Sequence, residues 1–322
     1  MKQLTIDVVI PTYNSLPYLK EALDSVLAQT YPKLEIYVID DGSTDNGATK
    51  KYVDSIGDPR IHYRRQANAG PSAARNLGIK ISGSPYVAFL DADDIWHETK
   101  LEKQLGLFAQ RPSVGLVYGL CRTVDKSGKQ LGKVIYHRRG KLFAYLLSGN
   151  WISGSASMAM VRREVFDKIG LFREDLLAGE DWEMWLRIAR DYEIDCLEEE
   201  VLDLRILGTS AQRSYNKMAK NLGRMFSVVN VEFSLGFFER RKLKAAISRE
   251  MALLYMNARE YRLARYSLWR AIYFWPATLI IDSSGIWLSY TRIVFGNSLL
   301  RSIRRRVSSN YRAREKENAQ KS

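Results

Sequence analysis

Three aspartates follow an almost continuous apolar run. In the stretch YVAFLDADDIW, which covers residues 86–96, Asp91, Asp93 and Asp94 fall within four positions. Carboxylates this close repel one another, and a buried charge is costly unless it is paired or bound to a metal. Carboxylate oxygens are ligands that Mg²⁺ and Mn²⁺ favour. The charge of this cluster is therefore stabilised either by water or by a divalent cation. The local alternative is that Asp93 or Asp94 is the N-cap of the next helix.

Polar residues also follow three other apolar runs. They occupy residues 11–14 (PTYN), 40–45 (DDGSTD) and 68–76 (NAGPSAARN). The last segment enters a helical pattern, and a helix start offers free backbone N–H groups and the positive end of a dipole. Arg75 adds a charged donor there, so the segment suits a phosphate. Taken alone, Asp40 and Asp41 could cap a turn, and Arg75 could be a solvated helix residue.

The apolar periodicity predicts the elements that hold these residues. Short apolar runs fall at residues 6–10, 34–39, 61–63, 86–90 and 114–120, and helical patterns fall at 17–28, 44–56, 71–81 and 98–110. Strands that alternate with helices predict an α/β fold, with a mostly parallel sheet covered by helices. In such sheets, ligands bind outside the carboxyl ends of the strands. The polar clusters lie at those ends, so we expect them to form one site.

Two common phosphate-binding motifs are absent from the sequence. No GxxxxGK(S/T) loop occurs, which disfavours a P-loop nucleotidase. No GxGxxG follows the first predicted strand, which argues against a dinucleotide-binding fold. A nucleoside diphosphate held by a metal is the interpretation that remains.

Four stretches resemble glycosyltransferase family 2, whose members have the GT-A fold. They are VVIPTYNSLPYLKEALDSVLAQTYPKLEIYVIDDGSTDNG, NAGPSAARNLG, FLDADDIW and GEDWEMWLRIAR, and they follow the family's order and spacing. The resemblance implies a GT-A nucleotide-diphospho-sugar transferase domain, which we place at residues 1–207. It also implies transfer of a sugar from a nucleotide-sugar, expected to be a UDP-sugar, with inversion at the anomeric carbon and with Mg²⁺ or Mn²⁺ as cofactor.

The resemblance implies a role for each matching position of the donor site. Pro11 and Tyr13 are expected to lie against the nucleotide base, and Asp41 is expected to accept a hydrogen bond from it. Arg75 is expected to face the diphosphate, where positive charge stabilises the leaving group.

The aspartate cluster is divided in the same way. Asp91 is expected to contact the ribose or the water shell of the metal, and Asp93 is expected to bind the divalent cation. For Asp94, a part in this site and a helix-capping role stay open.

Glu180 and Asp181 open an amphipathic pattern, EDWEMWLRIAR. An attacking acceptor hydroxyl must lose its proton, which requires a base on the side of the sugar away from the leaving group. The resemblance implies that Asp181 is this general base and that Glu180 tunes it or binds the acceptor. From local sequence alone, Asp181 could instead be the N-cap of the helix.

One departure from the family's processive synthases is informative. Those enzymes carry a Gln-x-x-Arg-Trp motif and several transmembrane helices, whereas here Gln212 and Arg213 are followed by SYN, with no Trp at the required place. We therefore expect a single-addition enzyme. Two other classes stay open: an inactive scaffold that binds nucleotide-sugar, and a nucleotidyltransferase that releases pyrophosphate.

Charge is distributed unevenly along the 322 residues. Residues 1–200 carry 26 Lys and Arg against 28 Asp and Glu, whereas residues 201–322 carry 23 against 8. The basic part predicts an anionic partner. We expect a membrane surface rather than nucleic acid, because no nucleic-acid-binding motif is visible. The sequence has no CxxC spacing and no secretory signal pattern, so we expect a location at the cytoplasmic face of the membrane.

The C-terminal part has a helical pattern. We expect residues 208–310 to form a basic helical region and residues 311–322 to form a disordered tail. Residues 245–276 resemble one helix–turn–helix unit of tetratricopeptide type, expected to be a hairpin packed on the catalytic domain. Residues 270–292 could span a membrane, lie in its interface or pack in a core. Polar interruptions and neighbouring arginines favour the interface, over residues 266–306.

The acceptor leaves no readable pattern in the sequence. A saccharide or lipid-linked acceptor of cell-envelope glycan synthesis is expected from the family and the basic C-terminal region together. The sequence carries no signal for which sugar is moved or for the oligomeric state.

Overall fold

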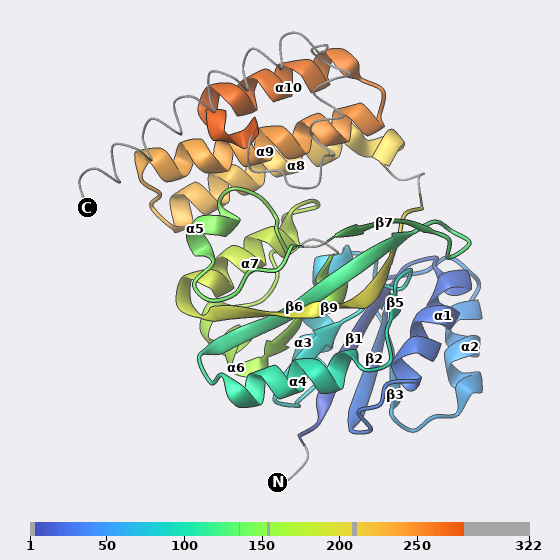
Figure 1. Ribbon diagram of the computed structural model, residues 1–322. Helices are drawn as coiled ribbons and strands as arrows, with labels where there is room; N and C mark the ends of the chain where they lie inside the picture. Colours follow the sequence, from blue (N-terminus) through green and yellow to red (C-terminus); the bar gives the residue numbers. More distant parts are fainter. Residues whose placement is uncertain (1–3, 135, 153–154, 208–210, 280–322) are drawn as a thin grey trace. The chain divides into compact units, whose positions relative to one another are not determined.

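The computed structural model describes residues 4–134, 136–152, 155–207 and 211–279. The chain divides into two compact units (Figure 1). The first comprises residues 1–146 and 150–208, and the second comprises residues 147–149 and the residues from 209 onward.

Four parallel strands form one half of the sheet in the first unit. β1 (Ile6–Thr12) lies between β2 (Leu34–Asp40) and β4 (Tyr86–Phe89), and β3 (Ile61–Arg65) pairs with the other edge of β2. Every residue of β1 and β4 is buried, as expected for central parallel strands covered on both faces. The predicted alternation of parallel strands and helices is confirmed for this half.

The other half of the sheet is mixed. Its strands are β5 (Ile95–Trp96), β6 (Val114–Val124), β7 (Gln130–Val134), β8 (Met160–Arg162) and β9 (Glu193–Arg205). β8 pairs antiparallel with β4 and β6, while β6 and β9 pair in parallel. Over the described residues the strand order is β3-β2-β1-β4-β8-β6-β9-β5, with β7 on β6. The periodicity does not predict β8 or β9, because β8 is very short and three consecutive glutamates interrupt the apolar pattern of β9.

Four helices follow the predicted patterns closely. They are α1 (Leu16–Leu27), α2 (Ala48–Ile56), α3 (Pro71–Ile81) and α4 (Lys100–Gln110). The helix predicted from residue 44 begins only at Ala48. The carboxylate of Asp45 accepts hydrogen bonds from the amides of Gly47 (3.1 Å) and Thr49 (2.9 Å), and this turn replaces the first helical residues.

Helix α3 lies very close to β1. A Cβ added to Gly78 would be 2.4 Å from Cγ1 of Val9, so only a residue without a side chain allows this approach. Because α3 also carries Arg75, the contact between Gly78 and Val9 sets how far Arg75 stands from the sheet.

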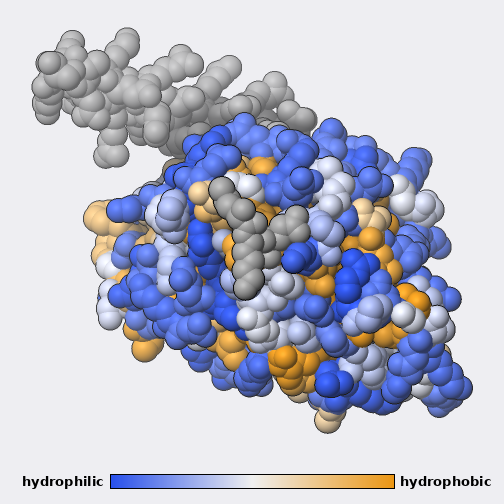
Figure 2. Space-filling view, turned by 90° about the horizontal axis from the view of Figure 1, so that it is seen from below, coloured by the Kyte–Doolittle hydropathy of each residue, from blue (hydrophilic) through white to orange (hydrophobic). Residues whose placement is uncertain are grey.

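Aromatic side chains connect the sheet to helix α7 (Glu180–Asp191). The ring of Phe89 on β4 packs edge-on against Phe172 with centroids 5.3 Å apart, and Phe172 packs against Trp185 of α7 at 6.2 Å. The strand that leads into the aspartate cluster and the helix that begins with Glu180 and Asp181 are thereby held in one core. On the one face that Figure 2 shows, hydrophobic residues lie among hydrophilic ones.

Polar contacts hold the loop that leads into α7. Asn76 donates to the carbonyl oxygen of Phe172 at 2.8 Å and accepts from its amide at 2.9 Å. Arg187 forms a buried ion pair with Glu183 at 2.8 Å and donates to the carbonyl oxygen of Leu171. The remaining short elements of the first unit are α5 (Phe143–Leu146), η1 (Ala156–Met158) and α6 (Arg163–Ile169).

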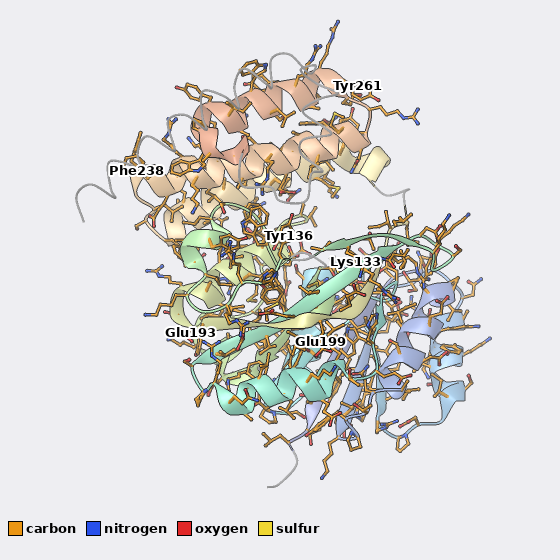
Figure 3. All side chains as sticks on the ribbon, viewed as in Figure 1. Lys133, Tyr136, Glu193, Glu199, Phe238 and Tyr261 are labelled. Carbon is orange, nitrogen blue, oxygen red and sulfur yellow. The ribbon has the colours of Figure 1, made fainter. Side chains whose placement is uncertain are left out.

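The second unit is helical within the described residues. α9 (Phe237–Asn257) packs against both α8 (Ala211–Glu232) and α10 (Tyr261–Phe274), and α10 runs into η2 (Pro276–Leu279). Phe238 marks the start of α9 and Tyr261 the start of α10 (Figure 3). The predicted helical hairpin is confirmed, and its packing on the catalytic domain stays a prediction.

The membrane prediction is tested only in part. No helix of the described chain is both long enough and apolar enough to cross a membrane. Most of the predicted interfacial segment 266–306, and all of the predicted tail 311–322, lie outside the described residues.

Candidate functional site

Asp91, Asp93 and Asp94 form the turn after β4. The amide of Asp91 donates to Ser157 Oγ at 2.9 Å, and Oδ2 of Asp94 accepts from the same hydroxyl at 2.6 Å. Oδ1 of Asp94 accepts from the amide of Arg205 at 3.0 Å. Asp94 is buried, and its two oxygens connect the turn to η1 and to the end of β9. Its role in the structure is therefore to brace the turn.

Within the described chain, the carboxylate of Asp93 has fewer hydrogen-bond partners than that of Asp94. Among the described residues, no side chain forms a hydrogen bond or ion pair with it. Burial, followed by the charge of Asp91, raises the pKa of Asp93, while the charge of Arg205 lowers it. The N-cap alternative for Asp93 and Asp94 is wrong, because Thr99 is the N-cap of α4. A partly buried carboxylate beside a second one is an environment that a divalent cation would stabilise.

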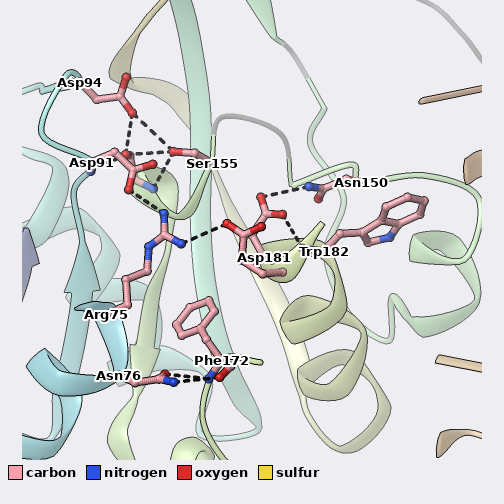
Figure 4. Close-up of polar contacts among 11 residues, drawn as sticks. Arg75, Asn76, Asp91, Asp94, Asn150, Ser155, Phe172, Asp181 and Trp182 are labelled. Atoms are coloured by element: carbon pink, nitrogen blue, oxygen red, sulfur yellow. Dashed lines mark hydrogen bonds and ion pairs between the residues drawn. The ribbon is translucent and has the colours of Figure 1, made fainter. Parts of the chain in front are cut away.

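Arg75 connects this turn to the start of α7 (Figure 4). Its Nη2 donates to Asp91 Oδ1 at 2.7 Å, and its Nη1 donates to Glu180 Oε1 at 3.3 Å. Burial by itself would lower the pKa of Arg75, but Asp91 and Glu180 raise it, so the guanidinium stays charged. Nε is buried without a hydrogen-bond partner among the described residues. The alternative of a solvated helix residue is wrong, because the side chain is only 4% exposed.

Asp181 lies next to this ion pair. Its Oδ2 accepts from Asn150 Nδ2 at 3.2 Å, and its Oδ1 accepts from the amide of Trp182 at 2.7 Å. Burial, followed by the charge of Glu180, raises the pKa of Asp181 to about 7, against the lowering effects of the Trp182 amide, Arg75 and Asn150. A carboxyl group with a pKa near neutrality can take up and release a proton at physiological pH.

The N-cap of α7 is Gly179, not Asp181. Gly179 has φ 77°, and the helix begins at Glu180. The local alternative for Asp181 is therefore wrong. The first turn contains the acidic residues Glu180, Asp181 and Glu183 at the positive end of the helix dipole.

Asp41 holds the loop that follows β3. Its Oδ1 accepts from Gln66 Nε2 at 2.7 Å and from the amide of Ala69 at 2.9 Å, and its Oδ2 accepts from the amide of Gly70 at 2.8 Å. Gly42 has φ 80°, and an added Cβ would lie 2.9 Å from the amide nitrogen of Asn68. These contacts place the β2 turn directly against the loop that opens α3. The hydrogen bond from a base to Asp41 stays a prediction.

The turn after β1 presents Tyr13 to solvent. Tyr13 is 47% exposed, whereas Pro11 is buried within β1. The turn is fixed to the end of β2, because the amide of Asn14 donates to Ser43 Oγ at 2.9 Å and its side chain accepts from the amide of Thr44 at 2.8 Å. Tyr13 is therefore available for stacking on a planar ligand, and the predicted contact of Pro11 would require the base to reach into the strand end.

These elements match a known protein family. The family model described as glycosyl transferase family 2 matches residues 7–170 of the chain. The chain belongs to glycosyltransferase family 2. The resemblance to this family is thereby confirmed, and the match covers three of the four sequence stretches, because GEDWEMWLRIAR begins at Gly179.

Curated relatives of this family 2 chain carry the same general description. An uncharacterized glycosyltransferase of Rickettsia felis is 33% identical over 191 residues, which are 58% of this chain and 31% of the relative. One of Haemophilus influenzae is 33% identical over 202 residues, which are 62% of this chain and 74% of the relative. The chain therefore spans about a third of the length of the first Rickettsia relatives.

Solved structures share the fold of this family 2 chain. Residues 1–349 of Staphylococcus aureus TarS, in complex with UDP-GlcNAc, align with a TM-score of 0.62 and 18% identity over 95% of this chain and 92% of TarS 1–349. The mannosyltransferase PcManGT of Pyrobaculum calidifontis, in complex with GDP-Man and Mn²⁺, aligns with a TM-score of 0.57 and 20% identity over 94% and 83%. The predicted GT-A fold with C-terminal helices is confirmed.

Sequence analysis did not identify three residues that lie near the site. Asn150 comes from a loop, Ser157 from η1 and Arg205 from the end of β9. No local pattern marks them, because each acquires its role only by contact with a residue at least 31 positions away. The glutamate-rich β9 gave no strand signal that could have brought Arg205 to attention.

Arg205 is notable for its buried charge. Its Nη2 pairs with Glu21 at 2.6 Å, and the guanidinium carbon lies 4.8 Å from the ring centroid of Tyr18. Its Nε and Nη1 are buried without hydrogen-bond partners among the described residues. The positive charge of Arg205 therefore offsets part of the negative charge of the aspartate cluster.

Proposed function

We propose that this chain is a non-processive, inverting, metal-dependent glycosyltransferase that uses a UDP-sugar. The observation that carries the proposal is the position of Arg75. It pairs with Asp91 on one side and with Glu180, next to Asp181, on the other. The guanidinium of Arg75 thus lies between two kinds of acidic group. On one side are the carboxylates of the aspartate cluster, which suit a cation, and on the other is the carboxyl group of Asp181, which suits proton transfer. Transfer of a sugar from a nucleoside diphosphate to a hydroxyl needs both.

Asp93 would hold Mg²⁺ or Mn²⁺, and Asp91 beside it would contact the ribose or the water shell of the metal. No group of three or more Asp, Glu, His or Cys residues in the described chain is arranged to hold a metal. The two carboxylates still fit, because Mg²⁺ in nucleotide enzymes is commonly bound by one or two carboxylates together with phosphates and water. When bound, the cation would neutralise charge on the departing nucleoside diphosphate. The neighbour solved with GDP-Man and Mn²⁺ supports this assignment.

Donor binding is assigned to the strand ends of the parallel half. Tyr13 would stack on the base, Pro11 would line its edge, and Asp41 would accept a hydrogen bond from it. Arg75 would donate to the diphosphate with its charged guanidinium, which the carboxylates of Asp91 and Glu180 keep protonated. The neighbour solved with UDP-GlcNAc supports a UDP-sugar as donor.

Asp181 would act as the general base. It accepts the proton of the acceptor hydroxyl while that oxygen attacks the anomeric carbon, and its Oδ atoms are held by Asn150 and the Trp182 amide. Attack opposite the leaving group is a single displacement, which inverts configuration and needs no covalent nucleophile. The pKa of about 7 supports this role, because a base is most efficient when its pKa lies near the working pH.

The acceptor is proposed to be a saccharide or a lipid-linked saccharide of cell-envelope glycan synthesis. Residues 1–207 would form the catalytic domain, and the basic region 208–310 would hold the protein at the cytoplasmic face of the membrane. The excess of 23 Lys and Arg over 8 Asp and Glu after residue 200 supports an anionic surface as partner.

A donor panel tests the proposed activity. UDP-, GDP- and dTDP-sugars are incubated with lipid-linked acceptors and Mn²⁺ or Mg²⁺, and the released nucleotide is identified. The proposal expects a nucleoside diphosphate, whereas pyrophosphate would show nucleotidyl transfer. Binding of UDP without any release would show the alternative function of an inactive scaffold.

Two variants separate the roles within the site. Asp93→Ala should weaken metal-dependent UDP binding and abolish transfer. Asp181→Asn should keep UDP binding while turnover falls by at least ~100-fold, the scale expected for loss of a general base. Asp54→Asn, at a surface aspartate of α2 that pairs with Lys50, is the matched control and should change neither quantity. Ordinary turnover by Asp181→Asn would overturn the base assignment.

A further inference from the structure

The outer face of α10 exposes a line of aromatic side chains. Tyr266, Trp269 and Tyr273 are 61%, 48% and 71% exposed. They recur at steps of three and four residues, so they share one side of the helix. The residues that α10 buries lie on the opposite side: Ala264, Ser267, Leu268 and Ala271. Three large rings in a row on the solvent side of a helix are a feature that usually marks an interaction surface.

Arginines flank this line of rings. Arg262, Arg265 and Arg270 are all exposed, and α10 contains no Asp or Glu. The guanidinium carbon of Arg270 lies 5.7 Å from the ring centroid of Tyr266, so the two side chains form one mixed surface. Charge and aromatic area are therefore combined on the same face, and every charge on α10 is positive.

We propose that this face of α10 docks on the anionic lipid headgroups of a membrane. The α10 face is defined by Arg262, Arg265, Tyr266, Trp269, Arg270 and Tyr273. Trp and Tyr side chains favour the headgroup region because they have an apolar ring and a polar tip, and arginines pair with lipid phosphates. The inference rests on the membrane attachment proposed above for residues 208–310 and assigns it to one helix face, but it does not depend on the proposed catalytic activity. It assigns membrane contact to residues that the structure describes, upstream of residue 280.

Two other occupants of the α10 face are disfavoured by charge. A second copy of the chain would bring the same arginines against it, and the whole chain carries a net charge of +13. Residues 280–322 carry nine Lys and Arg against three Asp and Glu, so their net charge is not complementary to the arginines of this face. Among anionic partners, a flat lipid surface suits a single outward-facing helix. Single-stranded nucleic acid is instead bound in grooves that follow its backbone.

Vesicle flotation with the 322-residue chain tests the inference. The probes are vesicles of phosphatidylcholine alone and vesicles that also contain phosphatidylglycerol. We expect binding only to the anionic vesicles, and weaker binding as salt rises, because screening reduces the arginine contribution. Replacing Tyr266, Trp269 and Tyr273 together by Ser should weaken vesicle binding by at least ~10-fold. Replacing Arg262, Arg265 and Arg270 by Gln should weaken it by about fivefold per arginine, equivalent to ~1 kcal/mol each.

Controls keep the result interpretable. All positions changed are exposed, so circular dichroism and thermal unfolding should match the original chain. Leu131→Ser, at a 58% exposed position on β7, is the matched apolar control and should keep full vesicle binding. UDP binding and donor turnover are measured in parallel, which separates a failure of docking from a failure of the proposed activity.

Each other outcome overturns the inference. If both multiple variants keep full vesicle binding, the membrane contact lies elsewhere in the chain. If the original chain does not bind anionic vesicles, the proposed contact does not exist. Equal binding to neutral and anionic vesicles would contradict the role of the arginines. Binding of single-stranded DNA, but not of vesicles, that is lost in the same variants would identify a nucleic-acid surface.

Discussion

Arg75 and Asp91 form a 2.7 Å ion pair between helix α3 and the turn after β4. The second Nη of the same guanidinium lies 3.3 Å from Glu180 at the start of α7. One buried cation therefore compensates carboxylates on two sides of the site. A ligand that engages Asp91 would change the share of positive charge left for Glu180, and through it the charge balance around Asp181.

This sharing predicts strong coupling between Arg75 and Glu180. Arg75→Met should lower the free energy of unfolding by ~3–5 kcal/mol, because it removes a buried cation and leaves two partly buried carboxylates uncompensated. Adding Glu180→Gln should recover part of that loss, with an interaction energy of ~1–3 kcal/mol in a double-mutant cycle followed by urea unfolding. The exposed pair of Lys50 and Asp54 is the comparison, and its cycle should give less than ~1 kcal/mol. Additive effects of Arg75→Met and Glu180→Gln would contradict the shared ion pair.

The raised pKa of Asp181 predicts the acidic limb of the pH–rate profile. A general base acts as the carboxylate, so kcat/KM should rise about tenfold per pH unit below the pKa of about 7 and level off above it. The measurement is kcat/KM from pH 5.5 to 9 at saturating metal, with thermal unfolding checked at each pH. The residual rate of Asp181→Asn should lack this limb. A rate for the original chain that stays constant from pH 5.5 to 9 would show that Asp181 does not limit the reaction.

The hydrogen bond from Asn150 predicts a shift of that limb. Asn150 Nδ2 donates to Asp181 Oδ2 at 3.2 Å, which favours the ionised carboxylate. Glu180, Arg75 and the Trp182 amide are the other groups that act on Asp181, and Asn150→Ala leaves them in place. In Asn150→Ala, the acidic limb of the pH–rate profile should therefore shift to higher pH by ~0.5–1 unit. Turnover should fall several-fold at pH 6.5 and recover above pH 8.5.

The Asn150 series has its own controls. Asn150→Asp places a like charge beside Asp181 and should move the limb further in the same direction. Asn221→Ala, an amide on α8 that bonds to the carbonyl oxygen of Lys217, should leave the profile unchanged. A uniform loss of turnover at every pH would mean that Asn150 supports the fold rather than the ionisation of Asp181.

The close approach of α3 to β1 predicts that Gly78→Ala is destabilising. Alanine has the higher helix propensity, but its Cβ would lie 2.4 Å from Val9 Cγ1. Overpacking of this kind typically costs 1–3 kcal/mol, so the melting temperature should fall. Donor affinity should fall with it, because α3 carries Arg75. Gly106→Ala on α4, where an added Cβ meets nothing within 4 Å, should be neutral or stabilising. Equal stability of both variants would show that α3 can shift without consequence.

Local sequence patterns were sufficient to predict the strands and helices of the parallel half of the sheet. A β-strand buried on both faces reads as a continuous apolar run, and an amphipathic helix repeats every three to four residues, so β1, β2, β4 and α3 could be predicted without any knowledge of their neighbours. The same reasoning could not find β9. Its strand character comes from pairing with β6 and β5 rather than from its own glutamate-rich sequence.

For the site, the sequence by itself determined which carboxylates and which arginine stand at strand and helix ends. It left their partners undetermined, because the contact between Arg75 and Glu180 joins residues 105 positions apart, and that between Arg205 and Asp94 joins residues 111 apart. Only the tertiary structure decided that Asp94 braces a turn and that no side chain in the described part of the chain bonds to the carboxylate of Asp93. The pKa of Asp181 depends on burial and on neighbours brought together by folding, so no local pattern of residues contains it.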